Sequence, residues 1–513
     1  MKIGFLSLGC PKNLVDSEVM LGLAEQAGHE ITTDADGADV VIVNTCAFID
    51  RAKQESIDTI LEMAGKKQAT GARLVVTGCL AERYRADLQK EIPEIDAVLG
   101  TGDVPNILAA LQPGSPATAG GASPLTFYRR DPGRGSGLGA RGSGQTPREH
   151  GTWSETGLPS EATTAALPRD PSPETRAPVF GVDLPTYLYD ADTPRRLSTP
   201  GHYAYVKIAE GCDYKCAFCV IPKMRGHYRS RTVESVVAEA RSLAGRGVKE
   251  LLLVSQDTTF YGLDRQEREA LPRLIRALDG VDGIEWVRLL YLYPTTITAA
   301  TIEAIASSPK VVRYIDLPLQ HAADPVLRRM KRPGTRGAYE RLLGSIRAAM
   351  PDVALRTTFI VGFPGETAAD VEELVGFLDA VRFDHVGVFT YSHEEDTSAF
   401  ALADDVPAAE KARRQRLVMA RQKRIVAARQ KARIGERARI LVDGPAAEHE
   451  WVMTGRLPGQ APEIDPQVFL TECGPDDAAP GQFLDVEIVG ARGYDLIARP
   501  VGADESVTPR PAR

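Results

Sequence analysis

The sequence has few cysteines and no long apolar run. Seven cysteines in 513 residues do not suggest a disulfide framework. No apolar stretch approaches the ~20 residues that a membrane-spanning helix needs. Residues 1–8 lack the basic region, apolar core and small-residue cleavage site of a secretory signal. These absences predict a cytoplasmic protein without a membrane segment.

An excess of positive charge is also absent, because the net charge is −8. This balance argues against a chain that binds nucleic acid over its whole surface, although a local basic patch would survive the average. In a reducing compartment, clustered cysteines more often bind metals or take part in catalysis than form disulfides. The spacing of the cysteines therefore indicates the chemistry.

Strand and helix signals alternate in two stretches and predict the α/β fold class. In residues 1–112 they predict an open parallel sheet wrapped by helices, with strands at 2–8, 39–44 and 73–77. In residues 198–433, six strand candidates predict a partial (βα)6 barrel with its chemistry at the carboxyl ends of the strands. These six candidates are residues 203–209, 250–254, 286–291, 313–317, 354–361 and 385–391.

The remaining segments have other compositions. Residues 113–185 read as a disordered linker or insertion, because about a third of residues 113–178 are Gly or Pro, above the ~25–30% typical of disorder. Residues 408–433 predict a helix with ten Lys or Arg. This helix either contacts RNA or is a solvated helix that packs through three apolar residues: Leu417, Val418 and Ile425. Residues 434–501 hold short strand candidates between Gly and Pro and predict a small β-barrel.

Three cysteines lie close together in the loop after the first barrel strand: Cys212, Cys216 and Cys219. Three thiolates with this spacing can wrap one cubane iron–sulfur cluster and leave its fourth iron open to a small molecule. The alternative is a structural zinc site, which needs four ligands and could take His202 or His227 as the fourth. No second CxxC-like pair lies nearby, so the spacing favours the cluster.

Three further cysteines each follow a predicted strand of the N-terminal sheet: Cys10, Cys46 and Cys79. Because neighbouring parallel strands lie ~4.8 Å apart and their carboxyl ends share one edge, the three thiols can meet at a second metal site. The alternative is three cysteines buried as small apolar side chains. Cys473 has no partner in the sequence and reads as an ordinary thiol.

The cysteine segments resemble those of the radical S-adenosylmethionine methylthiotransferases. Segments 8–18 (LGCPKNLVDSE), 44–49 (NTCAFI) and 77–80 (TGCL) are similar to the family's first-cluster motifs, and segment 210–222 is similar to its radical cluster loop. Segment 391–397 (YSHEEDT) looks most like the RimO-type branch, which usually has glycine at the position of Asp396. Members of that branch modify an aspartate in small-subunit ribosomal protein twelve, and their relatives modify adenosine in transfer RNA.

The resemblance implies two [4Fe-4S] clusters and S-adenosylmethionine (SAM) as cofactors. One cluster would bind SAM at its open iron and would be held by Cys212, Cys216 and Cys219. An auxiliary cluster would carry the sulfur or methylthio group and would be held by Cys10, Cys46 and Cys79. Residues that could shape the SAM pocket, or equally form turns and caps at strand ends, are Gln256, Gln320 and Glu366. The small C-terminal barrel would be TRAM-like.

The resemblance also implies a reaction and partners. Side-chain bases near neutrality cannot deprotonate the β-carbon of an aspartate, so a radical made from SAM would abstract a hydrogen there, and a second SAM would supply the methyl group. The electron donor would be a protein such as a flavodoxin or ferredoxin. The predicted function is thus methylthio insertion into ribosomal protein twelve, free or in the ribosome. The alternatives are a transfer-RNA adenosine methylthiotransferase and, from another class, a non-catalytic metal-bound scaffold.

The charge of the C-terminal segment bears on this choice of substrate. Residues 435–500 contain 12 acidic residues and five arginines with no lysine, a net charge of −7. An acidic domain suits a basic partner such as a ribosomal protein, whereas a domain that grips phosphates is expected to be basic. A solvated acidic surface without a partner is the alternative. Contact with nucleic acid is therefore predicted to be at most secondary.

Overall fold

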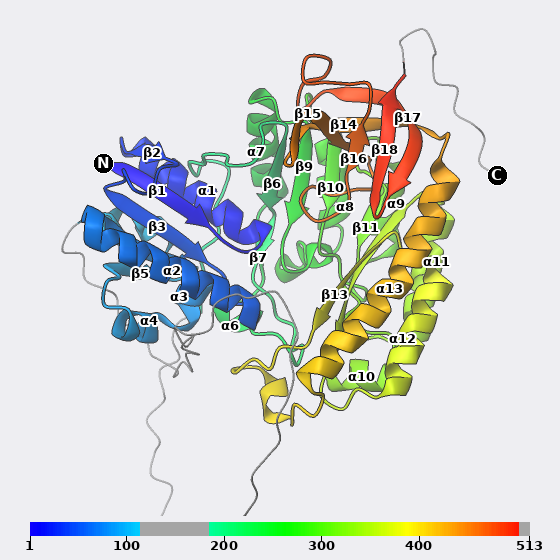
Figure 1. Cartoon of the computed structure of the whole chain (residues 1–513), viewed down its shortest axis with the longest axis horizontal. Helices are drawn as coiled ribbons and strands as arrows, with labels where there is room; N and C mark the ends of the chain where they lie inside the picture. The colour runs from blue at the N-terminus through cyan, green and yellow to red at the C-terminus, as the bar shows by residue number, and fades with distance from the viewer. Residues whose placement is uncertain (113–183, 502–513) are drawn as a thin grey trace, which may run out of the picture.

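The computed structural model describes residues 1–112 and 184–501. The linker predicted for residues 113–185 lies almost entirely outside these residues. The chain forms an N-terminal parallel sheet, a central open barrel and a small C-terminal β-barrel (Figure 1), which confirms the α/β architecture predicted from the sequence. In the part of the chain that the structure describes, no helix combines the length and apolar character needed to cross a membrane.

The N-terminal sheet has five parallel strands in the order β2-β1-β3-β4-β5. The strands are β1 (Lys2–Ser7), β2 (Glu30–Thr32), β3 (Val40–Thr45), β4 (Arg73–Gly78) and β5 (Ala97–Leu99). The helices are α1 (Pro11–Gln26), α2 (Asp50–Thr70), α3 (Cys79–Arg83), α4 (Arg85–Glu91) and α5 (Ile107–Ala110), with a 3-10 turn η1 (Val104–Asn106). All six residues of β3 are buried, as expected for a parallel strand covered on both faces.

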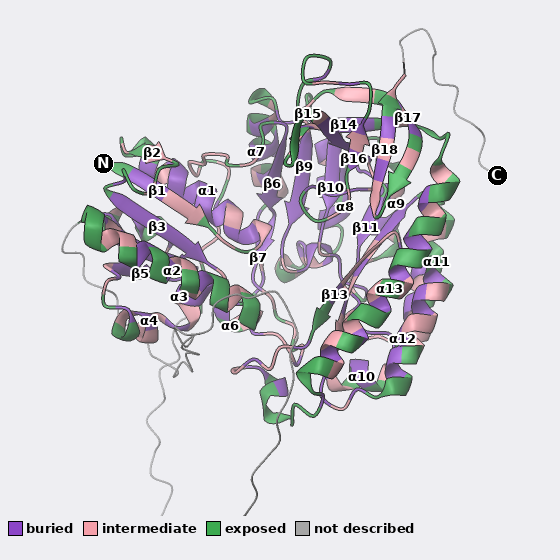
Figure 2. Ribbon diagram, in the orientation of Figure 1, coloured by how far each residue is buried: buried purple, intermediate pink, exposed green. Residues whose placement is uncertain are grey.

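The central barrel contains all six predicted strands, paired in parallel as β10-β9-β6 and β11-β12-β13. They are β6 (Tyr203–Lys207), β9 (Glu250–Val254), β10 (Trp286–Leu289), β11 (Tyr314–Asp316), β12 (Ala354–Val361) and β13 (His385–Thr390). Their connections include β7 (Ala209–Glu210), α6 (Ile221–Arg225) and β8 (Arg229–Ser230). The outer helices are α7 (Val233–Gly245), α8 (Ala270–Asp279), α9 (Ala299–Ser307), α10 (Asp324–Arg329), α11 (Arg336–Ala349) and α12 (Ala368–Val381). Strands are mostly buried and helices expose one side (Figure 2), so the core lies between the two layers.

The coil that enters the barrel crosses helix α1 of the N-terminal sheet. Arg195 binds Glu18 of α1 with Nη2–Oε2 at 2.6 Å, and the Ser198 backbone N–H donates to Glu18 Oε1 at 2.7 Å. Gly22 of α1 lies so close to this coil that a Cβ atom at position 22 would be 2.5 Å from the backbone nitrogen of Arg195. The first two units of the chain therefore pack against each other through buried polar contacts.

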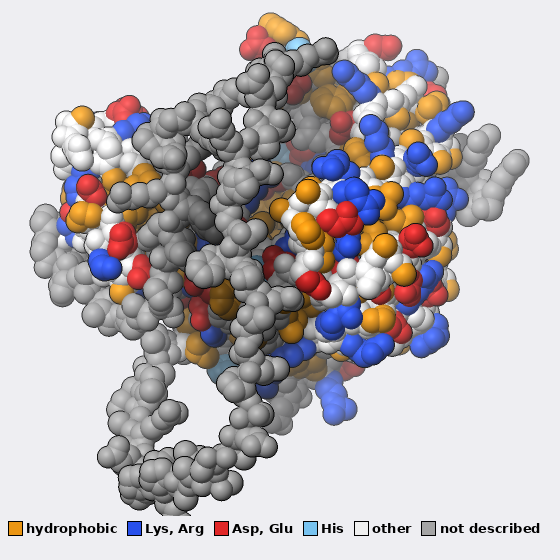
Figure 3. Space-filling model, turned by 60° about the horizontal axis from the view of Figure 1, so that its bottom comes forward, with side chains coloured by type: hydrophobic (Ala, Val, Ile, Leu, Met, Phe, Trp, Pro, Cys, Tyr) orange, Lys and Arg blue, Asp and Glu red, His pale blue; other side chains and the backbone are white. Residues whose placement is uncertain are grey.

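Helix α13 (Ala408–Arg433) has the predicted bounds and packs beside β13 and α12. Val418 and Ile425 are buried as predicted, but the prediction was wrong for Leu417, which is 42% exposed. Five of its arginines form ion pairs within the chain: Arg413, Arg414, Arg421, Arg429 and Arg433. On the face in Figure 3, Lys and Arg are interspersed with Asp and Glu, so the solvated, ion-paired interpretation of this helix is favoured.

The C-terminal barrel is closed, with strand order β14-β15-β16-β18-β17. Its strands are β14 (Arg437–Ala446), β15 (His449–Arg456), β16 (Val468–Leu470), β17 (Phe483–Arg492) and β18 (Asp495–Pro500). Cys473 is buried in its apolar core, as expected for an ordinary thiol. Asp443 joins this barrel to the central one through His202, at 2.9 Å between Oδ1 and Nε2.

Candidate metal centre at the domain interface

Three cysteines converge at the carboxyl edge of the N-terminal sheet. Cys10 immediately precedes α1, Cys46 directly follows β3, and Cys79 is the first residue of α3 after β4. Strands β1, β3 and β4 are neighbours in the sheet, so their carboxyl ends lie side by side. Each of the three thiols lies within electrostatic range of the other two. Burial, and after it the charges of the two neighbouring thiols, raise the pKa of the Cys46 thiol to about 12.

The second group of cysteines occupies the loop after β7. Cys212, Cys216 and Cys219 also interact electrostatically with one another. Gly211 has φ +89°, and a Cβ atom there would lie 2.0 Å from the carbonyl oxygen of His227, so this tight loop requires glycine. Burial raises the pKa of the Cys212 thiol to about 12. Buried thiols of this kind ionise when a metal compensates their charge, so the donor set fits a metal group.

Each of the two histidines considered as a fourth zinc ligand has a carboxylate, rather than one of these thiols, as its hydrogen-bond partner. His202 is hydrogen-bonded to Asp443 of the C-terminal barrel. His227 pairs with Asp213 at 2.8 Å and its side chain is 82% exposed. Within residues 1–112 and 184–501, no three His, Cys, Asp or Glu side chains converge on a site for a single ion. The thiolates of a cubane bind different irons, so three cysteines around a cluster need no such convergence.

Each cysteine group receives an arginine from the central barrel. Arg225 Nη2 donates to Cys79 Sγ at 3.3 Å, and Arg332 Nη1 donates to Cys216 Sγ at 3.8 Å. The Arg332 guanidinium also lies 3.8 Å from the centre of the Tyr293 ring. Hydrogen bonds to sulfur ligands shift the reduction potential of an iron–sulfur cluster. Sequence reasoning missed Arg332 and Tyr293, because no local pattern marks residues so far along the chain from Cys216.

A buried set of four charged residues, called the interface network below, lies beside Cys79 and includes Glu210, two residues before Cys212: Asp16, Lys207, Glu210 and Arg225. Arg225 Nη1 contacts Asp16 at 2.5 Å and Glu210 at 3.2 Å, while Lys207 Nζ contacts Asp16 and Glu210. Two carboxylates thus face two cations. Burial raises the pKa of Glu210, but Lys207 and Arg225 outweigh this effect and hold it at about 2. The network joins α1 to the barrel with balanced charge.

The three predicted pocket residues all follow barrel strands, on the same edge as the second cysteine group. Gln256 follows β9 and donates to Glu210. Gln320 follows β11 with φ +73°, and its backbone pairs with that of Phe359. Glu366 follows β12 and accepts from the Gly362 N–H at 2.8 Å and from Arg414 at 2.9 Å. The contacts of Glu366 brace a turn, which is the alternative that the sequence left open.

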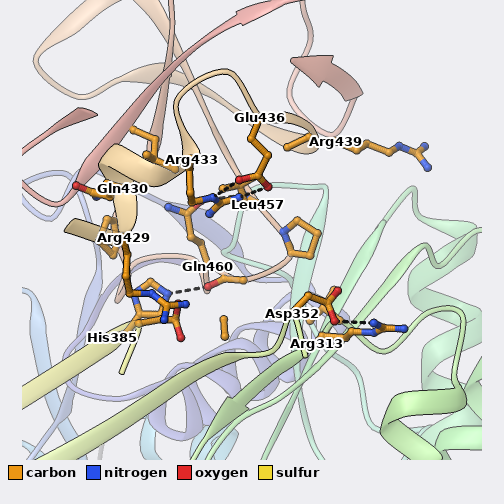
Figure 4. Close-up of a pocket in the computed structure, with 18 of the residues that line it drawn as sticks. Arg313, Asp352, His385, Arg429, Gln430, Arg433, Glu436, Arg439, Leu457 and Gln460 are labelled. Carbon is orange, nitrogen blue, oxygen red and sulfur yellow. Dashed lines mark hydrogen bonds and ion pairs between the residues drawn. The ribbon is translucent and has the colours of Figure 1, made fainter. Parts of the chain in front are cut away.

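A separate cavity of 880 Å³ lies between α13, the C-terminal barrel and the amino ends of the central strands (Figure 4). Its lining includes Trp286 and His385, the first residues of β10 and β13. Carboxylates in this lining are already paired, as with Arg313 and Asp352 at 2.6 Å. The cavity is therefore at the opposite end of the barrel from the cysteines.

Comparisons with known proteins agree with this architecture. Family models match residues 2–100 (Uncharacterized protein family UPF0004), 206–378 (Radical SAM superfamily) and 434–501 (TRAM domain). The ribosomal protein uS12 methylthiotransferase RimO of Koribacter versatilis is 46% identical over 504 residues, covering 97% of this chain and 96% of that protein. Its counterpart from Pelotomaculum thermopropionicum is 43% identical over 502 residues, covering 98% and 99%.

Among solved structures, the radical SAM methyltransferase TsrM from Kitasatospora setae is similar with a TM-score of 0.47 and 17% identity, covering 76% of this chain and 72% of that one. The family matches and the cysteine loop define a radical SAM enzyme. The chain belongs to the RimO family of methylthiotransferases, which confirms the resemblance seen in the sequence. Membership implies SAM and iron–sulfur chemistry of the [4Fe-4S] type.

Proposed function

We propose that this chain inserts a methylthio group at the β-carbon of an aspartate in ribosomal protein uS12. The observation that carries the proposal is the presence of two groups of three free cysteines, one after the strands of the N-terminal sheet and one in the loop after β7. Relatives that share 40–46% of their residues with this chain along nearly its whole length are named uS12 methylthiotransferases. No observation favours the transfer-RNA or scaffold alternatives.

Two [4Fe-4S] clusters fit the two groups of thiols, because three ligands leave one iron of a cubane open. Cys212, Cys216 and Cys219 would hold the cluster that binds SAM. Cys10, Cys46 and Cys79 would hold the auxiliary cluster. When bound, these cofactors supply the one-electron chemistry that an unactivated carbon–hydrogen bond requires.

The chain's own residues would orient and insulate these groups. Arg225 and Arg332 each donate a hydrogen bond to one cysteine sulfur and so lower the local negative charge. Gln256, Gln320 and Glu366 lie on the carboxyl edge where SAM would bind. We propose Gln256 and Gln320 as pocket residues, and Glu366 as the residue that holds the loop after β12 in place.

The acidic C-terminal barrel would dock the basic substrate. Asp443 and Asp465 already bind the central barrel. Asp443 pairs with His202, and Asp465 accepts from the Tyr314 hydroxyl at 2.6 Å. Eight acidic residues of this domain are exposed, of which Glu436 pairs with Arg433 and Glu463 accepts from the Tyr203 hydroxyl. The other six are Glu448, Glu450, Glu472, Asp476, Asp477 and Asp485. A patch of this sign attracts a basic protein and repels phosphates.

The remaining expectations from the sequence join this proposal. The domains would span residues 1–112, 198–433 and 434–501, with 113–185 as a linker. The protein would act in the cytoplasm, with a flavodoxin or ferredoxin as electron donor.

The proposal is tested by incubating anaerobically reconstituted enzyme with SAM, a reductant and either uS12 or transfer RNA. We expect the mass of uS12 to rise by one methylthio group and the transfer RNA to remain unchanged. The Cys10→Ala variant serves as control and is expected to form deoxyadenosine without modifying uS12. Modification of transfer RNA alone would overturn the proposal.

A further inference from the structure

The segment after the last barrel strand reaches across to the N-terminal sheet. Ser392 Oγ accepts from the Asp50 backbone N–H at 3.3 Å, and Glu394 Oε2 accepts from Lys53 at 2.8 Å and from Arg83 at 2.9 Å. The Tyr84 hydroxyl donates to the next residue of the segment, Glu395. Residues 392–396, called the latch below, thus bind four residues of the other domain.

The partners of the latch lie next to the auxiliary cysteines. Arg83 is the last residue of α3, whose first residue is Cys79. Arg83 Nη1 also donates to the carbonyl oxygen of Ala47 at 3.3 Å, and Ala47 directly follows Cys46. Lys53 lies in the first turn of α2, which begins a few residues later. One arginine therefore connects two auxiliary cysteine segments to Glu394.

Glu394 is the buried centre of the latch. Its side chain is 2% exposed and that of Arg83 is 3% exposed, so water screens this ion pair little. The second carboxylate oxygen, Oε1, accepts from Ser392 at 2.6 Å. Because both oxygens are occupied by the chain itself, Glu394 is not available to bind a basic substrate. Its contacts act on the relative position of the two domains.

We propose that Glu394 is a positioning residue that fixes the auxiliary cysteine edge relative to the radical-forming barrel. The inference rests on the proposed function, in which one domain makes the radical and the other delivers the methylthio group. Transfer between two separately held groups is sensitive to distance, since a misplacement of ~1 Å costs about 10²-fold in rate. Loss of the latch then uncouples radical formation from transfer without stopping radical formation.

The test compares Glu394→Gln, which keeps the shape and removes the charge, with Glu250→Gln. Glu250 is equally buried and binds Arg288 at 2.8 Å and Arg456 at 2.6 Å, at the end of the barrel far from the cysteines. For each full-length holoenzyme, the amounts of deoxyadenosine and of methylthiolated uS12 are measured in the same reaction. We expect Glu394→Gln to retain deoxyadenosine formation and iron content, and to lose ~10- to 100-fold in product per deoxyadenosine. Glu250→Gln is expected to keep the wild-type ratio.

Hydrogen–deuterium exchange supplies a readout that does not depend on turnover. We expect amides of residues 47–53 and 80–84 to exchange faster in Glu394→Gln than in wild type or Glu250→Gln. Lys53→Gln, which removes the more exposed partner, is expected to change both readouts in the same direction by less. An unchanged ratio of products in Glu394→Gln, or an equal fall in Glu250→Gln, overturns the inference. If wild type forms deoxyadenosine but modifies no uS12, the proposed function is wrong. In that case the hydrogen–deuterium exchange still tests the latch, and unchanged amide exchange in Glu394→Gln overturns it.

Discussion

Replacing Arg225 by methionine tests how the interface network holds the two domains together. The change keeps an unbranched apolar side chain and removes the guanidinium. Two cations and two carboxylates then become one cation, Lys207, facing both Asp16 and Glu210, which leaves one buried negative charge without compensation. Removing one partner of a buried ion pair costs about 3–5 kcal/mol. We expect the free energy of unfolding to fall by that amount.

A double-mutant cycle with Asp16→Asn separates charge balance from lost packing. The double variant leaves Lys207 paired with Glu210 alone, so we expect it to be more stable than Arg225→Met by about 1–3 kcal/mol, although it carries more substitutions. Urea unfolding of cluster-free protein, followed by circular dichroism, measures these differences. Arg421→Met, which breaks a half-exposed pair, serves as control and is expected to cost under ~1 kcal/mol. An Arg225→Met cost equal to that of the control would refute the reasoning.

Three further predictions address single positions. Cys46→Ala is expected to lose about four irons per chain and to keep the cluster of the other group, as measured by iron and sulfide content. Asp443→Asn is expected to lower stability by about 2 kcal/mol near neutrality. Burial raises the pKa of Asp443, but contacts with His202 and Arg456 lower it by more, so this pKa lies below its usual value. The stability difference from wild type is therefore expected to persist above pH ~4 and to close as the pH falls below ~4. A gap that widens in acid would contradict this. Asp396 has φ +67° and pairs with Lys223 at 2.9 Å and with Arg83 at 3.7 Å, so Asp396→Gly exchanges ~1 kcal/mol of backbone strain for two ion pairs of similar total size. Its melting temperature is expected to stay close to that of wild type.

Most of the fold could be predicted where apolar residues follow a regular period. The six barrel strands were found from that signal and α13 from its charged composition, whereas β2 and β5, with three residues each, are too short to show a period. Helix α1 begins at Pro11. Its first turns bury Lys12 and Asn13 against the barrel, so an apolar pattern could not locate them.

The functional site could likewise be predicted only in part. The cysteines were predicted because their spacing, or their place after strands, is a local property of the chain. The contacts of Arg225 and Arg332 with cysteine sulfurs join residues 146 and 116 positions apart. Only the tertiary structure brings such pairs together, and their charges carry no periodic signal in the sequence.

The polar face of α1 has a consequence for how the protein is made. Asp16 and Glu18 are synthesised long before Arg195, Lys207 and Arg225, their partners 177 to 209 positions later. Until those residues emerge during translation, burying this face would leave two carboxylates without cationic partners. Each unpaired buried carboxylate would cost several kcal/mol of folding free energy. The nascent N-terminal sheet therefore keeps this edge hydrated. Its final docking waits for the first strand and cysteine loop of the barrel to be synthesised.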